Sequence, residues 1–159
     1  MQTLSQNLSL WDSQLNEDEI LLIKLHPFLH GLEDFSGYHH ILPFPASWDT
    51  YEGLSVCDTL ITDYSSVFFD VAYLEKPELY YQFDEAEFRQ YHYKQGYFDY
   101  RRDGFGPVCT TEDALLQALE TALQNGMHMP PEYKTRTAAF FPLRDTQNCA
   151  RTYEAICGL

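Results

Sequence analysis

The chain has 159 residues, enough for one compact domain with a sizeable core. It is 45% hydrophobic and 16% aromatic, which excludes a disordered chain. Ten basic and 24 acidic residues give a formal charge of −14, so a nucleic-acid backbone or an anionic bilayer would be repelled, whereas a small phosphorylated ligand is not excluded.

The sequence carries no sign of secretion or of membrane insertion. No apolar run approaches the roughly 20 residues that span a bilayer. The polar N-terminus lacks the basic-then-apolar layout of a signal peptide. The four cysteines are widely spaced and form no C-x-x-C pair, a pattern typical of buried thiols in a reducing compartment. They are Cys57, Cys109, Cys149 and Cys157. We therefore expect a cytoplasmic protein.

Helices alternate with short apolar strands in the first part of the chain. Apolar residues at helical spacing predict a helix over 4–15. The apolar run 20–27 predicts a strand that is buried on both faces, and 39–44 predicts a weaker second strand. Asp49 is expected to cap a short helix that reaches Cys57.

The same alternation continues to the C-terminus. Residues 58–63 predict a third strand, after which Ser65 or Ser66 opens a helix through Leu74. Further strands are predicted at 78–83 and 107–110, separated by a helical stretch at 84–95 and an aromatic, Gly-punctuated loop at 96–106. Three helices complete the prediction, at 111–124, 131–140 and 145–157.

This order of elements indicates an α/β fold with a Rossmann-like, doubly wound parallel sheet. In open parallel sheets, ligands bind outside the carboxyl ends of the strands. Two polar segments, 24–27 and 62–66, are predicted to lie at such an edge. Both segments are therefore candidates for a ligand site.

The segment 62–66 leads from a strand through a tight turn directly into an apolar helix. N–H groups in the first turn of a helix have no acceptor within the helix, so together with the hydroxyls of Ser65 and Ser66 they favour a phosphate site. The alternative is structural: Ser65 as the N-cap of the helix and Asp63 as a turn former. The two roles are compatible.

The other candidates allow a functional and a structural interpretation each. At the end of its strand, His26 is suited to donate to a phosphate oxygen or to act as an acid or base, or else to bond a loop carbonyl. A zinc site is disfavoured, because closed zinc sites need four convergent ligands. The aromatic residues at 91–100 would stack a nucleobase or pack a loop onto the domain. Arg151 would reach the phosphate site or pair with Glu154.

A long segment of the chain, DTLITDYSSVFFDVAYLEKPELYY (58–81), resembles the C-terminal lobe of the CDP-glycerol glycerophosphotransferases. This family builds the poly(glycerol phosphate) chains of teichoic acids and related cell-surface polymers. Shorter matches follow in family order across nearly the whole chain, at 24–27, 49–58, 95–107 and 140–156.

The resemblance implies a GT-B architecture, in which two Rossmann-like lobes face each other across a cleft. Residues 1–159 would form a single donor-binding lobe, with 130–159 as its C-terminal helices. His26 would take part in donor binding and catalysis, and Ser65, Ser66 and Arg151 would contact the donor diphosphate. Supporting residues would be Asp63, Thr62 and Lys94. Neither a metal nor a cofactor is expected, since CDP-glycerol is the donor substrate.

The chain departs from the family pattern in two respects. Gln95-Gly96 stands where the family usually has Arg-Gly, which leaves Lys94 as the nearest cation. The chain also begins after the point where the first strand of the lobe should lie, and the acceptor-binding lobe is missing. We expect either an excised fragment or a natural short protein that works differently.

In a full-length enzyme, an acceptor hydroxyl would attack the glycerol-bearing phosphorus of CDP-glycerol and CMP would leave. We expect this chain alone to bind the CDP-activated polyol without efficient turnover. The acceptor, a glycerol-phosphate polymer or a glycolipid, would bind through the missing lobe, and the full-length protein would sit peripherally at the inner face of the cell membrane. No nucleic-acid partner is expected.

Three alternatives remain open at this stage. One is a GT-B glycosyltransferase lobe that uses a nucleotide sugar. Another is a non-catalytic module that senses nucleotide, associates with itself or assembles with a separate N-terminal lobe; an exposed apolar face would mark it. The least specific is an α/β domain that binds no ligand.

Overall fold

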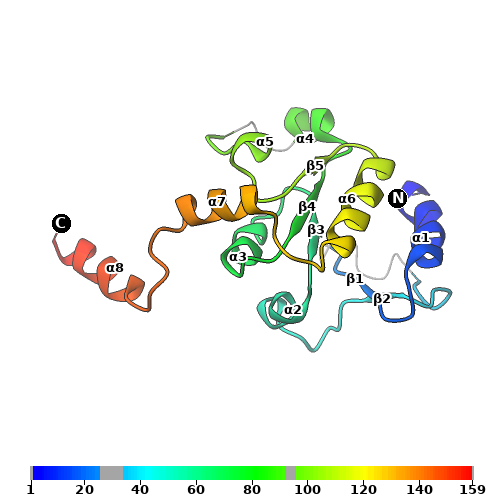
Figure 1. Ribbon diagram of the computed structural model, residues 1–159, viewed down its shortest axis with the longest axis horizontal. Helices are drawn as coiled ribbons and strands as arrows, with labels where there is room; N and C mark the ends of the chain where they lie inside the picture. The colour runs from blue at the N-terminus through cyan, green and yellow to red at the C-terminus, as the bar shows by residue number, and fades with distance from the viewer. Residues whose placement is uncertain (1, 26–33, 92–95, 159) are drawn as a thin grey trace. The chain divides into compact units, whose positions relative to one another are not determined.

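The computed structural model describes residues 2–25, 34–91 and 96–158 (Figure 1). Contacts group the chain into two compact units, Met1–Thr50 and Tyr51–Leu159. We describe each unit by itself, so the single lobe expected over residues 1–159 stays a prediction. Among the described residues, none of the helices is both long enough and apolar enough to cross a membrane.

The first unit contains helix α1 (Gln2–Gln14) and two parallel strands, β1 (Leu21–Ile23) and β2 (Ile41–Pro43). The carboxylate of Asp12 accepts hydrogen bonds from the backbone N–H groups that precede β2, which ties α1 to that strand. The expectation that the first strand is buried on both faces is wrong. Leu22 is 36% exposed, because a sheet of two strands leaves part of its surface uncovered.

The second unit is built on three parallel strands in the order β3-β4-β5, which span Leu60–Thr62, Glu78–Tyr81 and Val108–Cys109. Helix α3 (Phe68–Tyr73) lies on one side of this sheet and helix α6 (Glu112–Gln124) on the other (Figure 1). Every described strand pair is parallel, which confirms the predicted α/β class. The hydrogen bonds nevertheless form two separate sheets rather than one.

Helix α2 (Thr50–Val56) precedes β3, and α4 (Glu85–Tyr91) follows β4 as predicted. The segment predicted as a loop at 96–106 contains a short helix, α5 (Tyr100–Asp103). It forms because the side chain of Asp99 caps it, accepting hydrogen bonds from the backbone N–H groups of Arg101 (3.0 Å) and Arg102 (2.9 Å). Helices α7 (Pro131–Phe140) and α8 (Asn148–Cys157) confirm the two predicted C-terminal helices.

The core of the second unit is aromatic. Helix α3 contributes Phe68, which packs against Tyr80 of β4 and against Phe105, a residue between α5 and β5. Two members of the aromatic segment 91–100, Phe98 and Tyr100, pack against this cluster, so they serve to hold the segment onto the domain. Burial of these rings supplies much of the apolar area that stabilises the unit.

Strands β4 and β5 are joined by a close backbone approach. A Cβ atom at Gly106 would lie 1.7 Å from the carbonyl oxygen of Glu78, so only glycine fits there. The side chain of Glu78 is 1% exposed and accepts a 2.6 Å hydrogen bond from the hydroxyl of Tyr80. Burial raises the pKa of Glu78 to about 8. The first residue of β4 therefore carries a buried carboxyl group.

Helix α8 buries none of its residues. Its apolar side chains Tyr153 and Ile156 are 70% and 64% exposed. Cys149 and Cys157 are exposed on the same helix, whereas Cys109 is buried and Cys57 partly buried, so the expectation of four buried thiols is wrong for two of them. The sequence could not reveal this, because α8 is amphipathic in pattern but has no partner within the described residues.

Candidate functional site

The turn between β3 and α3 is anchored by its own side chains and by the end of β4. The carboxylate of Asp63 accepts a hydrogen bond from the backbone N–H of Tyr64 (2.6 Å). The carbonyl of Asp63 accepts a second one from the side-chain amide of Gln82 (3.0 Å), which is buried. Since Thr62 is the last residue of β3, these bonds fix the direction in which the chain leaves the sheet.

The structure gives Ser65 and Ser66 no capping role. Helix α3 begins at Phe68, and its cap position is Val67, which makes no side-chain cap hydrogen bond. The prediction that a serine opens the helix is therefore wrong. The reason is an intervening turn, in which the N–H of Phe69 donates to the carbonyl of Ser66 (3.1 Å).

Both serines are exposed at the carboxyl edge of β3. Within the part of the chain that the structure describes, neither their hydroxyls nor their backbone N–H groups have a hydrogen-bond partner. Helix α3 has only six residues, so its dipole contributes little to anion binding. The capacity of this turn to bind an anion rests on its hydroxyl and N–H donors.

Tyr64 connects this turn to the segment after β4. Its hydroxyl donates to Oδ1 of Asp84 (3.1 Å), and its ring stacks on that of Phe88 with centroids 3.6 Å apart and planes 8° from parallel. Burial raises the pKa of Tyr64, and the hydrogen bond to Asp84 raises it further. The phenol therefore stays neutral and holds the two turns at one edge of the sheet.

Arg151 is not brought to this turn. It bonds Oδ2 of Asp145 at 2.5 Å and Oδ1 of Asn148 at 2.7 Å, at the beginning of α8. This pair holds the pKa of Asp145 below its usual range. The alternative expectation, that Arg151 pairs with Glu154, is wrong, because the carboxylate that it pairs with is that of Asp145. In Figure 1, α8 stands well clear of α3.

Sequence reasoning missed Arg89, a cation of helix α4 that lies beside the turn. Its guanidinium lies 5.8 Å from the ring centroids of both Tyr64 and Phe88. The available signal was a lone arginine in the first helix after β4, but nothing in the sequence distinguishes it from Arg101 or Arg102. Those two arginines form ion pairs with Glu85 and Asp103.

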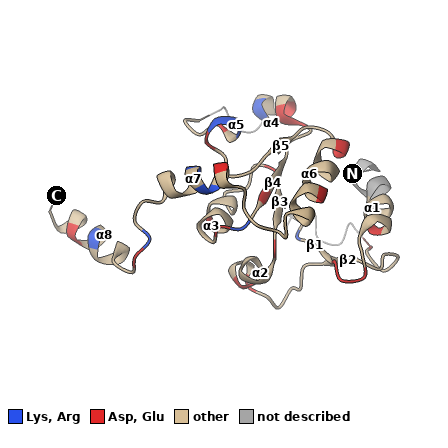
Figure 2. Ribbon diagram, viewed as in Figure 1, with Lys and Arg blue, Asp and Glu red and all other residues tan. Residues whose placement is uncertain are grey.

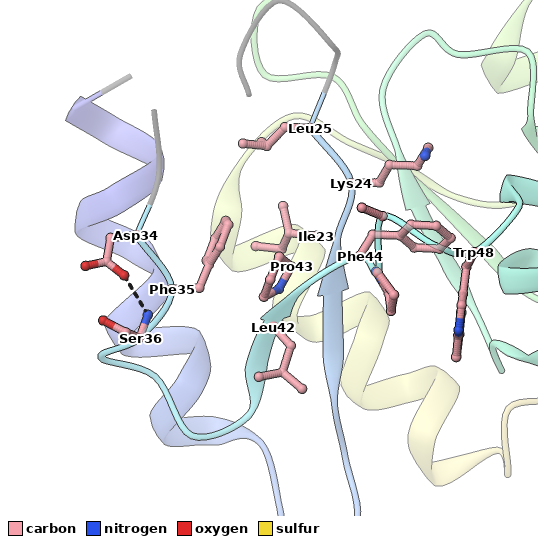
Figure 3. Close-up of a pocket in the computed structure, with 12 residues that line it drawn as sticks. Ile23, Lys24, Leu25, Asp34, Phe35, Ser36, Leu42, Pro43, Phe44 and Trp48 are labelled. Atoms are coloured by element: carbon pink, nitrogen blue, oxygen red, sulfur yellow. Dashed lines mark hydrogen bonds between the residues drawn. The ribbon is translucent and has the colours of Figure 1, made fainter. Parts of the chain in front are cut away.

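A cavity of about 780 Å³ lies in the first unit, at the carboxyl ends of β1 and β2 (Figure 3). Its walls are mainly apolar and include Phe44 and Trp48, whose rings meet edge-on at 6.1 Å. The ammonium group of Lys24 lies 4.5 Å from the centroid of the Phe44 ring. The lining also contains the carboxylate of Asp34, so the cavity combines aromatic walls with one charge of each sign.

Three predicted positions lie outside the described residues, namely His26, Tyr93 and Lys94, so their roles stay predictions. Of the other aromatic candidates for a nucleobase, Tyr91 and Tyr97 are 70% and 85% exposed. No three His, Cys, Asp or Glu side chains converge as metal ligands anywhere in residues 2–25, 34–91 and 96–158. The expectation that the reaction uses no metal stays a prediction.

Sequence comparison relates the chain to proteins of teichoic acid synthesis. The sequence model of the family described as CDP-Glycerol:Poly(glycerophosphate) glycerophosphotransferase matches residues 1–158. The chain is 39% identical over 100 residues to the minor teichoic acid biosynthesis protein GgaB of Bacillus subtilis (strain 168), which covers 63% of this chain and 11% of GgaB. It is 32% identical over 109 residues to the teichoic acid glycerol-phosphate primase of the same strain, with 68% of this chain and 28% of the primase covered.

Solved structures of the wall teichoic acid polymerase TagF share the fold. One matches with a TM-score of 0.72 and 24% identity, covering 94% of this chain and 37% of TagF. A TagF variant soaked with CDPG matches with a TM-score of 0.68 and 27% identity, covering 86% of this chain and 32% of TagF. The likeness confirms the expected α/β lobe of GT-B type. The chain covers between 11% and 37% of the lengths of GgaB, the primase and the TagF chains.

Proposed function

The chain belongs to the CDP-Glycerol:Poly(glycerophosphate) glycerophosphotransferase family, and we propose that it holds the activated CDP-polyol donor by its diphosphate. CDP-glycerol is the donor that the family's description suggests. The proposal concerns donor binding, because the chain spans only a minor part of its relatives' length.

The observation that carries the proposal is the free hydrogen-bonding capacity of the β3–α3 turn. Ser65 and Ser66 are exposed, neither caps α3, and their donors have no partner among the described residues. The turn itself is fixed by the bonds of Asp63 and Tyr64, so the backbone that carries the two serines is held in place before a ligand arrives. Backbone N–H groups and hydroxyls presented on a fixed turn suit the oxygens of a diphosphate.

In the full-length enzyme, the hydroxyl of the acceptor attacks the glycerol-bearing phosphorus of the donor. A new P–O bond forms to the acceptor, the bond to the CMP oxygen breaks, and a base takes the hydroxyl proton. Phosphoryl transfer depends mainly on positioning and on neutralising charge. The serine pair would stabilise the charge that builds on departing CMP, and His26 would donate to a phosphate oxygen.

Acceptor binding falls to parts of the full-length protein beyond this chain. The acceptor would be a glycerol-phosphate polymer or a glycolipid, reached at the inner face of the cell membrane. We therefore expect the chain alone to bind donor without efficient turnover. Sustained polymer synthesis by the purified chain would contradict that expectation.

The test is a calorimetric and thermal-shift titration of the chain with CDP-glycerol, CDP, CMP, UDP and UDP-glucose. Ligand at one hundred times its dissociation constant should stabilise the fold by about 2.7 kcal/mol. The double variant Ser65→Ala/Ser66→Ala should lower the affinity for CDP-glycerol at least about tenfold, which corresponds to one or two lost charge-assisted hydrogen bonds.

Ser55→Ala is the matched control, since Ser55 is an exposed serine of the same unit whose hydroxyl bonds only the carbonyl of Glu52. It should leave binding unchanged. A preference for UDP-glucose over CDP-glycerol would instead favour a nucleotide-sugar transferase. Binding of none of the five ligands would refute the proposal for this chain, as would equal binding by wild type and the double serine variant.

A further inference from the structure

Arg89 occupies the space next to the proposed diphosphate site. It belongs to α4, and its guanidinium lies 5.8 Å from the ring centroids of Tyr64 and Phe88, which stack on each other. Tyr64 immediately precedes Ser65 in the β3–α3 turn. Because β3 and β4 are parallel, the segments that follow them emerge at the same edge of the sheet. Arg89 therefore lies at the ligand-binding edge.

The positive charge of Arg89 is not matched by a carboxylate among the described residues. Its Nε atom is buried and has no hydrogen-bond acceptor there. Asp84, which precedes the helix, accepts from Tyr64, and Glu85 in the first turn of the helix pairs with Arg101 at 3.3 Å. A buried donor without an acceptor is unfavourable, and native proteins rarely keep one.

Every other Lys or Arg of the second unit that the structure describes has an ion-pair or hydrogen-bond partner. Arg101, Arg102, Lys134, Arg144 and Arg151 form ion pairs with carboxylates, of which that of Lys134 is the longest at 3.9 Å. Lys76 and Arg136 bond backbone carbonyls. Arg89 differs from these in having no ion pair among the described residues and a buried Nε without an acceptor. Figure 2 shows its helix beside α5, where basic residues gather.

The positive charge of Arg89 favours lower pKa values for two tyrosine hydroxyls, those of Tyr64 and Tyr100. Burial raises the pKa of Tyr100, and the positive charge of Arg89 partly offsets that rise. It acts in the same direction on Tyr64. The charge of Arg89 thus acts on the turn that carries the serine pair, because Tyr64 belongs to that turn.

We propose that Arg89 is the cation that binds the donor diphosphate beside Ser65 and Ser66, an inference that rests on the proposed function. A guanidinium presents a planar fork of donors that matches two phosphate oxygens. Arg89 lies beside the stacked rings of Tyr64 and Phe88, at the same distance from both centroids. A local cation also offsets the repulsion that a chain of charge −14 exerts on a diphosphate. Arg89 would supply at this edge the positive charge that the family resemblance led us to expect from Arg151, with support from Lys94.

A purely structural role, in which Arg89 only packs against the two rings, makes a different prediction. Loss of packing would lower the stability of the unligated chain and would weaken all ligands alike. Loss of a phosphate contact would weaken diphosphates selectively and would reduce the dependence of binding on salt, because a screened charge pair has disappeared. Ligands that differ only in phosphate content therefore separate the two roles.

The experiment titrates the whole chain with CDP-glycerol, CDP, CMP and inorganic pyrophosphate at two salt concentrations. Arg89→Gln should weaken CDP-glycerol and CDP by about 30-fold or more, since removal of one partner of a desolvated charge pair has effects of this size. CMP, which lacks the second phosphate, should weaken several-fold less. Arg89→Lys should recover part of the loss by restoring the charge without the fork.

Arg101→Gln is the matched control, because Arg101 is a neighbouring arginine that already has Glu85 as its partner. It should change the affinity for CDP less than about threefold, as expected for an exposed ion pair. Thermal unfolding without ligand checks that each variant is folded.

Three results would overturn the inference. In the first, Arg89→Gln binds CDP-glycerol as tightly as wild type, in which case the inference fails while the proposed function stands. In the second, it weakens CDP and CMP by the same factor, or Arg89→Lys recovers nothing, and Arg89 is then a packing residue. In the third, wild type binds none of the four ligands, so that the proposed function and the inference both fail.

Discussion

The hydroxyl of Tyr64 donates a hydrogen bond to Oδ1 of Asp84 across 3.1 Å. Tyr64 follows β3 and Asp84 follows β4, so this bond joins the turns that leave two neighbouring parallel strands. Ser65 comes directly after Tyr64, and Arg89 is on the helix that begins directly after Asp84. The bond therefore connects the turn of the serine pair to the start of the helix that carries Arg89.

Removal of this bond should weaken the fold by a modest and measurable amount. Tyr64→Phe keeps the ring on Phe88 but removes the hydroxyl, and should lower the free energy of unfolding by about 1 kcal/mol. A double-mutant cycle with Asp84→Ala, which removes the acceptor, should give a coupling energy of about 0.5–1.5 kcal/mol by urea unfolding. Strictly additive effects would show that the two side chains do not interact in solution.

The buried carboxyl of Glu78 should make stability depend on pH. Its pKa is raised to about 8 in the folded chain, whereas the ordinary value of 4.5 applies after unfolding. Below pH 4.5 both states are protonated and the fold has its full stability. As the pH rises toward 8, the unfolded state releases a proton that the folded state retains, so stability falls by up to about 1.4 kcal/mol per pH unit.

Glu78→Gln should abolish this part of the pH dependence and should stabilise the chain above pH 8. The measurement is urea unfolding at pH values from 5 to 9. Glu120→Gln, a change at an exposed carboxylate of α6, is the control and should leave the pH profile as it is. Identical profiles for wild type and Glu78→Gln would show that Glu78 ionises normally.

Lys76 should stabilise the second unit through the C-terminal end of α2. Its ammonium group donates to the carbonyls of Leu54 (3.1 Å), Ser55 (2.5 Å) and Cys57 (2.6 Å). A cation there also complements the helix dipole. Lys76→Met keeps the aliphatic stem but removes these bonds, and should lower the free energy of unfolding by about 2 kcal/mol.

Lys134→Met provides the comparison for Lys76, because Lys134 is exposed and has only a distant ion pair with Glu75 at 3.9 Å. Its effect should stay within about 0.5 kcal/mol. If urea unfolding gave the same loss of unfolding free energy for both lysine variants, Lys76 would have no special role at the end of α2.

The serine pair should be neutral for stability. Because Val67 occupies the cap position of α3, Ser65→Ala and Ser66→Ala should each change the free energy of unfolding by less than about 0.5 kcal/mol. An N-cap serine would instead contribute about 1 kcal/mol. Thermal or urea unfolding without ligand distinguishes the two values, and a loss of cap size would restore the capping interpretation.

Much of the fold was predictable because local patterns decide it. The apolar runs at 20–27, 58–63 and 78–83 predicted strands, which the structure places at the shorter ranges of β1, β3 and β4, and the alternation with helices predicted that they run parallel. Helix α6 was equally clear, since Thr111 caps it by accepting from the N–H of Ala114 (3.3 Å). The helix α5 was missed, because the cap at Asp99 is a local bond hidden within an aromatic segment.

The candidate site was predictable only in its location. The serine pair after β3 follows from a strand, a polar turn and an apolar helix in succession, and the family resemblance points to the same residues. The partner of Arg151 was not predictable, because two acidic residues, Asp145 and Glu154, lie near it in sequence and only the fold of 141–148 selects Asp145. Likewise, exposure of Cys149 and Cys157 depends on what covers α8.

The sequence by itself determined the order of the elements, the parallel α/β class, the family and the segment that carries Ser65 and Ser66. These depend on periodicity and on contiguous motifs, which the chain displays along its length. Only the tertiary structure decided that Val67 rather than a serine is at the cap position of α3, that Glu78 is buried, and that Arg89 lies beside Tyr64 with no carboxylate partner in the described part of the chain. The physical reason is that burial and charge pairing are set by neighbours distant in sequence.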